Sequence, residues 1–228
     1  MKKLHEFTVK KKVIKKVEEK TEVGTLIKEV ESTEDKVCFI KIPNRLDLDK
    51  ARIVQSSEFG LAVSLGCQPR ESLRKAILDG GGFAYAKVDI EQLEKILPAL
   101  NEKRNEFQKL KIDGGETSIV EKELEELFQV VIDMEQRLTD VYKHSAETIA
   151  EQNTVIWAIL NLTFWVDETP VFTGHTDESK KESYLRVFDD PETYSSELEV
   201  FNQAYIVLDA YMFKGYNKEQ IEEILKDG

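Results

Sequence analysis

The stretch "NTVIWAILNLTFWV", residues 153–166, decides how this chain folds. It carries both tryptophans and is apolar on almost every face, although Asn161 and Thr163 interrupt it. A membrane-spanning helix needs about 20 consecutive apolar residues, whereas this run is shorter and ends at Asp167 and Glu168. We therefore expect a water-soluble protein with no membrane partner. In such a protein a run this apolar is a helix surrounded by its neighbours in the core.

The composition is that of a globular protein with a charge-rich surface. The chain has 228 residues, of which 41% are hydrophobic and 33% are charged, and a chain of this size can bury a core without disulfide bonds. Cys38 and Cys67 show no CxxC spacing. This favours two reduced thiols, with a single disulfide as the alternative.

The net charge of −12 is unevenly distributed along the chain. Residues 1–16 hold seven lysines and one glutamate, a net charge of +6, whereas residues 167–228 hold six basic and fifteen acidic residues, a net charge of −9. The acidic bulk repels nucleic acid, so we expect no nucleic-acid partner. The lysine-rich start either contacts an acidic partner or faces water on an exposed strand, where lysines discourage edge-to-edge pairing.

The first 43 residues predict a three-stranded antiparallel β-meander. In "FTVKKKVIKKV", residues 7–17, apolar and lysine positions alternate with the period of a half-buried strand. Two further strand-like segments follow at residues 22–31 and 36–43, and the turn-like cluster "STED" separates them. We place a domain boundary at Pro43, so that residues 1–43 form the meander and residues 44–228 form a helical domain.

A long helical hairpin is predicted at about residues 88–148. Its second helix, residues 117–148, has apolar residues spaced alternately by four and three, as in a coiled-coil seam. These residues are Val120, Leu124, Leu127, Val131, Met134, Leu138 and Val141. The short "DGGETS" connection favours pairing with the preceding helix, and pairing with a second copy of the protein is the alternative.

Helical periodicity continues to the end of the chain. Apolar and aromatic residues share a stripe over residues 198–212, and shorter amphipathic segments lie before and after it. We expect these segments to form a C-terminal bundle around residues 153–166. The predicted fold is therefore α+β and mainly α-helical, with the N-terminal meander, the long hairpin and this bundle.

No set of residues predicts catalysis. His175 lies near Asp177, and Asp189 and Asp190 form an acidic pair, but a complete set of metal ligands is not evident. A solvated loop with a helix N-cap at Thr176 or Asp177 explains the first group equally well. The glycine runs at 79–82 and 113–115 lack the Lys-Ser/Thr tail of phosphate loops. We expect no catalytic residue, no metal site and no cofactor, and thus a protein that is not an enzyme.

Four short motifs together carry a family resemblance. They are "KIPNR" at 41–45, "RKAILDGGG" at 74–82, "NTVIWAILNLTFW" at 153–165 and "PVFTG" at 170–174. In this order they resemble small structural and tail-assembly proteins encoded by large contractile-tailed bacteriophages. The resemblance implies a non-enzymatic virion or tail-assembly protein, chaperone-like in its action, found in the virion or the host cytoplasm. Its partners would be other phage structural or assembly proteins, or a second copy.

Two surfaces are the candidates for partner binding. Lys10, Lys12 and Lys16 lie on a predicted strand that can pair edge-on with the sheet of another subunit. Val171 and Phe172 lie in the "PVFTG" loop, which we expect to expose them. The alternatives are an adaptor or inhibitor that binds a host protein through its acidic helical face, and an enzyme whose site gathers distant residues such as His175 and the nearby acids.

Overall fold

A computed structural model describes residues 1–21, 24–80 and 84–227, and leaves undescribed the side chains of residues 12, 14–20, 21, 24–31, 84, 224, 226 and 227. By their contacts the described residues form two units. Unit 1 comprises residues 1–58 and 151–228, and unit 2 comprises residues 59–150. The chain passes into unit 2 within helix α1 (Arg45–Ser64) and returns within helix α5 (Ala146–Leu162).

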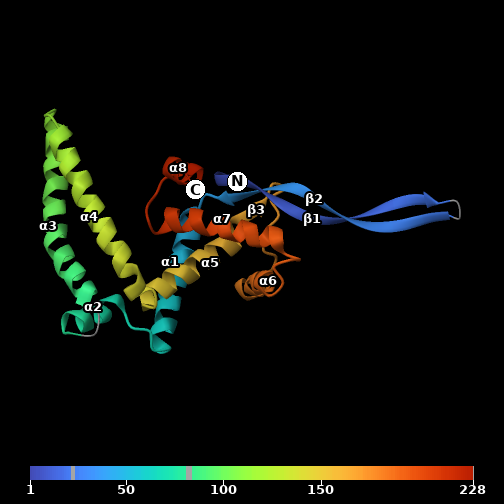
Figure 1. The fold of residues 1–228 in the computed structure, drawn as a ribbon, viewed down its shortest axis with the longest axis horizontal. Helices are drawn as coiled ribbons and strands as arrows, with labels where there is room; N and C mark the ends of the chain where they lie inside the picture. The colour runs from blue at the N-terminus through green and yellow to red at the C-terminus, as the bar shows by residue number, and fades with distance from the viewer. Residues whose placement is uncertain (22–23, 81–83, 228) are drawn as a thin grey trace. The chain divides into compact units, whose positions relative to one another are not determined.

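The sheet of unit 1 is built on one long hairpin. Strand β1 (Lys3–Thr21) pairs antiparallel with β2 (Gly24–Lys41) along the whole length of both, from Lys3 opposite Lys41 to Thr21 opposite Gly24. A short third strand, β3 (Thr163–Trp165), pairs antiparallel with β2 at Cys38–Ile40, which gives the strand order β1-β2-β3. Figure 1 shows the far part of the hairpin extending beyond the helices of unit 1.

The structure confirms the α+β, mainly helical class with an N-terminal antiparallel sheet of three strands. The prediction placed all three strands in residues 1–43, whereas the third strand comes from residues 163–165. The "STED" cluster, residues 32–35, is not a turn, because β2 runs straight through it. These polar residues lie opposite residues 10–13, so that Asp35 faces Lys10 and Glu34 faces Lys11. Opposite charges across a ladder stabilise strand pairing, and this outweighs the local turn preference.

The core of unit 1 confirms the role predicted for the apolar run, with one change. Helix α5 ends at Leu162, and the last residues of the run form β3 instead of continuing the helix. Val155, Ile159 and Leu162 are fully buried. The same core takes in side chains from β1, β2 and the three helices α6 (Asp177–Asp189), α7 (Ser195–Met212) and α8 (Lys218–Asp227).

Polar side chains of the apolar run find partners. Asn153 Nδ2 donates to Glu58 Oε2 at 2.7 Å, and the hydroxyl of Thr163 donates to the carbonyl of Ile159 at 2.7 Å. Asn161 donates to the carbonyl of Trp157 and accepts from Lys180 Nζ at 2.7 Å. The cost of burying unpaired amides, about 1–3 kcal/mol each, is therefore avoided.

Unit 2 contains the predicted helical hairpin. Helix α2 (Arg70–Leu78) precedes α3 (Ala84–Asp113), which continues through Pro98 and packs against α4 (Ser118–Tyr142). The seam residues Val120, Leu124 and Val131 are buried with Leu100 of α3. This confirms that the helix over residues 118–142 pairs within the chain.

A bidentate ion pair ties the two long helices of unit 2 together. Arg137 donates to both carboxylate oxygens of Asp89, at 2.8 and 2.9 Å. The hydrogen bond from Arg137 is the main cause that lowers the pKa of Asp89, although burial opposes it. Asp89 is therefore anchored as a carboxylate on the inner side of the hairpin.

The two units group residues differently from the predicted division at Pro43, since unit 1 contains both the sheet and the C-terminal helices. Independent folding of residues 1–43 stays a prediction. The cysteines Cys38 and Cys67 both carry free thiols. Among the described helices, none has an apolar stretch long enough to cross a membrane.

Candidate functional site

The most extended surface of unit 1 is the β1–β2 ribbon. Its strands are 19 and 18 residues long. Among the described side chains, Lys11 of β1 forms an ion pair with Glu197 of α7 at 3.4 Å. We call the part of the ribbon beyond this point, residues 12–33, the arm. Figure 1 shows the arm standing clear of the helices.

The register of the ribbon places acidic residues of β2 opposite several lysines of β1. Lys10 lies opposite Asp35, Lys11 opposite Glu34 and Lys16 opposite Glu29. The basic strand is thus paired with an acidic one, and residues 10–35 hold seven lysines and seven acidic residues. Of the predicted partner-binding lysines, Lys10 is exposed, whereas the side chains of Lys12 and Lys16 lie outside the described residues.

The base of the arm is fixed to the core through Trp165. The Nζ atom of Lys36 lies 3.9 Å from the centre of the indole ring, and that of Lys11 lies 5.6 Å from it. Burial is the main cause that lowers the pKa of Lys36, and the nearby Lys11 lowers it further. Cations over an indole face are attracted by the ring quadrupole, so Trp165 holds both strands at the point where the arm leaves the core.

Val171 and Phe172 are core residues, so the expectation that they are exposed is wrong. Their exposed fractions are 6% and 0%. Phe172 packs edge-on against Phe201 of α7 with ring centres 6.5 Å apart. The loop turns both side chains inward because β3 and the following residues lie on the sheet, where the Val171 amide donates to the Thr163 carbonyl at 3.2 Å.

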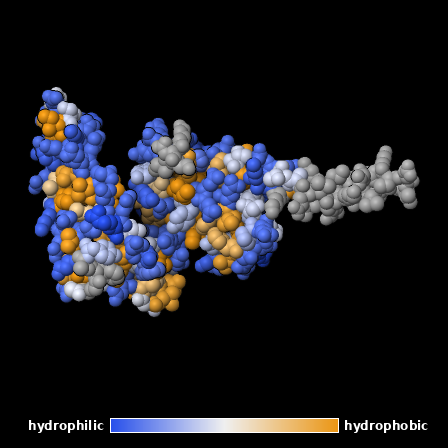
Figure 2. All heavy atoms as spheres, in the orientation of Figure 1, coloured by the Kyte–Doolittle hydropathy of each residue, from blue (hydrophilic) through white to orange (hydrophobic). Residues whose placement is uncertain are grey.

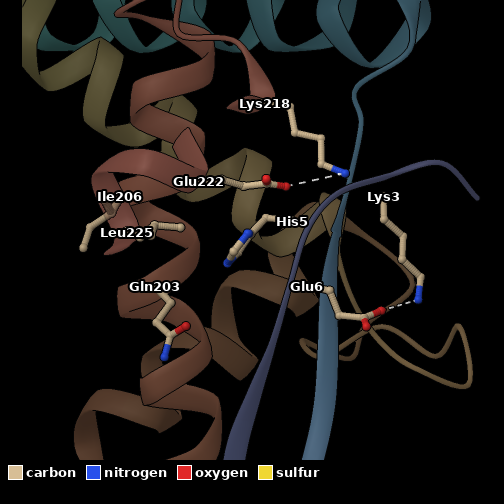
Figure 3. A pocket seen from close by; sticks show the side chains of 8 residues that line it. All are labelled: Lys3, His5, Glu6, Gln203, Ile206, Lys218, Glu222 and Leu225. Atoms are coloured by element: carbon tan, nitrogen blue, oxygen red, sulfur yellow. Dashed lines mark hydrogen bonds and ion pairs between the residues drawn. The ribbon is translucent and has the colours of Figure 1, made fainter. Parts of the chain in front are cut away.

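An open pocket of about 820 Å³ lies where β1 meets α7 and α8. Figure 3 shows its lining, in which the imidazole of His5 points from β1 toward the two helices. Two ion pairs join charged groups of the lining, Lys3 with Glu6 and Lys218 with Glu222. The lining residues are Lys3, His5, Glu6, Gln203, Ile206, Lys218, Glu222 and Leu225.

His5 is the titratable group that distinguishes this pocket. Burial is the main cause that lowers the pKa of His5, while Glu222 raises it and Lys218 lowers it. The imidazole is therefore held neutral near pH 7, with one nitrogen able to donate and the other to accept. Because the neighbouring charges are already paired, the pocket suits a polar side chain or backbone group of a partner better than a strongly charged ligand.

Two of the residues proposed for a distant enzymatic site, Asp177 and Asp190, have structural partners at the ends of helix α6. Thr176 caps α6 in a reciprocal capping box with Ser179, as the N-cap interpretation predicted. Asp177 accepts from the indole of Trp157 at 3.1 Å, and the backbone of Asp190 caps the end of α6. His175 is exposed. In the described part of the chain, no three His, Cys, Asp or Glu side chains are grouped so as to hold a metal ion.

A cluster of aromatic side chains reaches the surface between α6 and α7. Phe188 lies 5.3 Å from Phe201 and 4.9 Å from Tyr184, measured between ring centres, and it is 46% exposed. Figure 2 shows hydrophobic residues scattered among hydrophilic ones on the face that carries α7. This cluster is the aromatic part of the acidic C-terminal region.

No protein-family model matches the sequence, and neither the curated proteins nor the solved structures contain one with significant similarity to it.

Sequence reasoning missed both the His5 pocket and the Trp165 contact. His5 and Glu222 are separated by more than 200 residues, and no local pattern links them. The alternation of residue types along β1 was the one sequence signal that could have pointed to the pocket, since it places His5 and Val9 on the same side of the strand. The contact of Lys36 with Trp165 depends on the pairing of β3 with β2, which the sequence pattern did not indicate.

Proposed function

We propose that this protein is a non-enzymatic structural or tail-assembly protein of a contractile-tailed bacteriophage, and that it acts through contacts with other proteins. The phage assignment rests on the four motifs in their shared order along the chain. It places the protein in the virion or in the host cytoplasm during assembly, with phage structural or assembly proteins as its partners.

The observation that carries the contact role is the arm. A two-stranded ribbon has no core of its own and is marginally stable in water, yet here the pairing of β1 with β2 continues from Lys11, where β1 contacts Glu197 of α7, to Thr21. A partner that covers one side or one edge of the arm would stabilise it. The arm is thus the part of unit 1 that gains most from binding another chain.

Quantitative mass spectrometry of purified particles, and of gradient fractions that contain tail intermediates, tests the proposal. We expect the protein to copurify with particles or with an assembly intermediate at a fixed copy number. Its absence from particles and from all intermediates would contradict the proposal. A chain shortened in the arm by deletion of residues 14–31 should lose the association while unit 1 keeps its fold.

The second candidate is an adaptor or inhibitor that binds a host protein through the acidic C-terminal region. The exposed Phe188 within a region of net charge −9 favours it, since aromatic side chains are enriched in protein–protein interfaces relative to the rest of the surface. This function predicts one host partner whose binding weakens as salt rises. Substitution of Phe188 would abolish that binding, whereas deletion of the arm would not affect it.

A further inference from the structure

The pocket between β1, α7 and α8 is lined by two polar side chains that form no hydrogen bond within the described part of the chain. They are the imidazole of His5 and the carboxamide of Gln203, and both are half-buried. Figure 3 shows the imidazole on the strand side of the pocket and the carboxamide on the side of α7. The volume of about 820 Å³ is that of a ligand site. A ligand that supplies hydrogen bonds to both side chains would therefore be stabilised here.

The charged side chains of the lining are already paired with one another. Lys3 pairs with Glu6 on β1, and Lys218 Nζ lies 3.8 Å from Glu222 Oε1 on α8. These ion pairs hold two positive and two negative groups. Burial is the main cause that lowers the pKa of His5, so the imidazole adds no charge near pH 7. A charged ligand would lose its hydration and would have to break one of these pairs to find an opposite charge in the lining.

The hydrogen-bonding capacity of His5 and Gln203 indicates which neutral group fits. A neutral imidazole has one donor and one acceptor, and a carboxamide has an NH₂ donor and a C=O acceptor. A carboxylate only accepts and an ammonium group only donates, so either would leave half of this capacity unused. A second carboxamide offers donors and an acceptor at separate atoms, and it matches both side chains without adding charge.

Two apolar side chains complete the lining on the helix side. Ile206 of α7 is 53% exposed, and Leu225 of α8 is partly buried. Their remaining surface is removed from water when an apolar group lies on it. A methylene stem that ends in a carboxamide supplies both kinds of contact. Among protein side chains, glutamine has the longer stem of this kind.

We propose that this pocket binds a glutamine side chain of a partner chain, with its carboxamide hydrogen-bonded to His5 and Gln203 and its methylenes against Ile206 and Leu225. This inference rests on the proposed function, since it names the chemistry of one contact through which the protein would act. The contact is separate from the arm, because the residues of β1 in the lining lie between Lys3 and Glu6 and the arm begins at residue 12.

Nuclear magnetic resonance titration of the full chain with a capped glutamine, N-acetylglutamine N-methylamide, tests the proposal. The chain has three histidines, and the exposed His144 and His175 serve as internal controls when the histidine rings are labelled with ¹³C. The His5 signal is the one that is missing in His5→Gln. We expect this signal to shift in a saturable way in the millimolar range, as for other ligands of this size, and the other two to stay in place.

Two related compounds test the chemistry of the ligand on the wild-type chain. Capped asparagine has one methylene less and should bind about fourfold more weakly. Capped glutamate has the shape of glutamine but carries a charge that must lose its hydration, so it should bind on the order of tenfold more weakly.

Two variants of α7 test the position of the site. Gln203→Leu removes the carboxamide but keeps a side chain of similar size, and it should weaken binding of capped glutamine on the order of tenfold. The control Asn202→Ala removes an exposed carboxamide from the neighbouring position outside the lining, and it should bind as the wild type does. Far-UV circular dichroism checks that each variant is folded.

An unchanged His5 signal, equal binding of capped glutamine and capped glutamate, or full binding by Gln203→Leu would overturn the proposal. Any of these results would leave the proposed function standing. Absence of the protein from phage particles and assembly intermediates would contradict the proposed function, while the preference of the pocket for capped glutamine would stay as measured.

Discussion

Replacing Phe172 by alanine tests the finding that the "PVFTG" loop belongs to the core. The Phe172 side chain is fully buried and packs against Phe201. Truncation of a buried phenylalanine removes its transfer free energy and leaves a cavity, which together cost about 3–5 kcal/mol. A loop residue on an open binding surface would cost less than about 1 kcal/mol, so the two interpretations of this residue differ severalfold.

Urea unfolding followed by tryptophan fluorescence measures this change in the correct unit, because Trp157 and Trp165 both lie in unit 1. With an m-value of about 2–3 kcal/mol per molar urea, the loss lowers the unfolding midpoint by about 1–2 M. The matched control is Phe188→Ala, which truncates a phenylalanine that is 46% exposed. We expect it to cost less than about 2 kcal/mol, since part of its surface is already in water.

A core position of Phe172 is refuted if the stability of Phe172→Ala lies within about 1 kcal/mol of the wild type, or if the substitution costs no more than Phe188→Ala. Either result would mean that the loop does not hold Phe172 in the core. A variant that keeps its stability but loses a binding partner would restore the original interpretation of this loop as an exposed contact surface.

Three further predictions concern titratable groups. Because the hydrogen bond from Arg137 lowers the pKa of Asp89 in the fold, the pair stabilises unit 2 above the unfolded pKa of about 3.9, and this contribution is lost as the pH falls through the folded value. Asp89→Asn should therefore be less stable than the wild type at pH 7, and the difference should shrink as the pH falls below about 3.9, measured by chemical unfolding followed by circular dichroism. The lowered pKa of His5 has the same sign, so that unit 1 should lose stability as the pH falls below about 6.5, and His5→Gln should reduce this loss in urea unfolding at pH 7 and 5. Burial raises the pKa of Cys38 to about 12, so a thiol reagent at pH 8 should label Cys67 alone in the folded chain and both cysteines in urea; rapid labelling of Cys38 in the native protein would contradict the buried position.

The parts of the fold that sequence predicted are those encoded by local periodicity. The 4,3 spacing of α4 and the apolar run of α5 each fix a buried side within one element, so the hairpin and the central helix follow from the pattern alone. Helix ends were less well determined, since α5 gives way to β3 at Thr163. That change depends on β2 as a pairing partner, which lies more than 100 residues away.

The errors arise where tertiary contacts overrule local preference. The "STED" cluster has turn composition, but cross-strand pairing of Asp35 with Lys10 keeps it in β2. Val171 and Phe172 follow a proline in a loop, but the sheet and α7 offer them a core position. The candidate pocket depends on His5 meeting α8 from the opposite end of the chain, and no spacing rule on a single segment contains that information.

The hydrogen bond between Asn153 and Glu58 has a consequence for how this chain can change over evolution or in the laboratory. It holds the exit of the chain from unit 1 next to its point of return. The ninety-odd residues between them therefore form an inserted segment whose two ends lie next to each other. Such an inserted segment can be lengthened by whole heptads, exchanged for another helical hairpin, or replaced by a short linker, while the chain path of unit 1 stays the same.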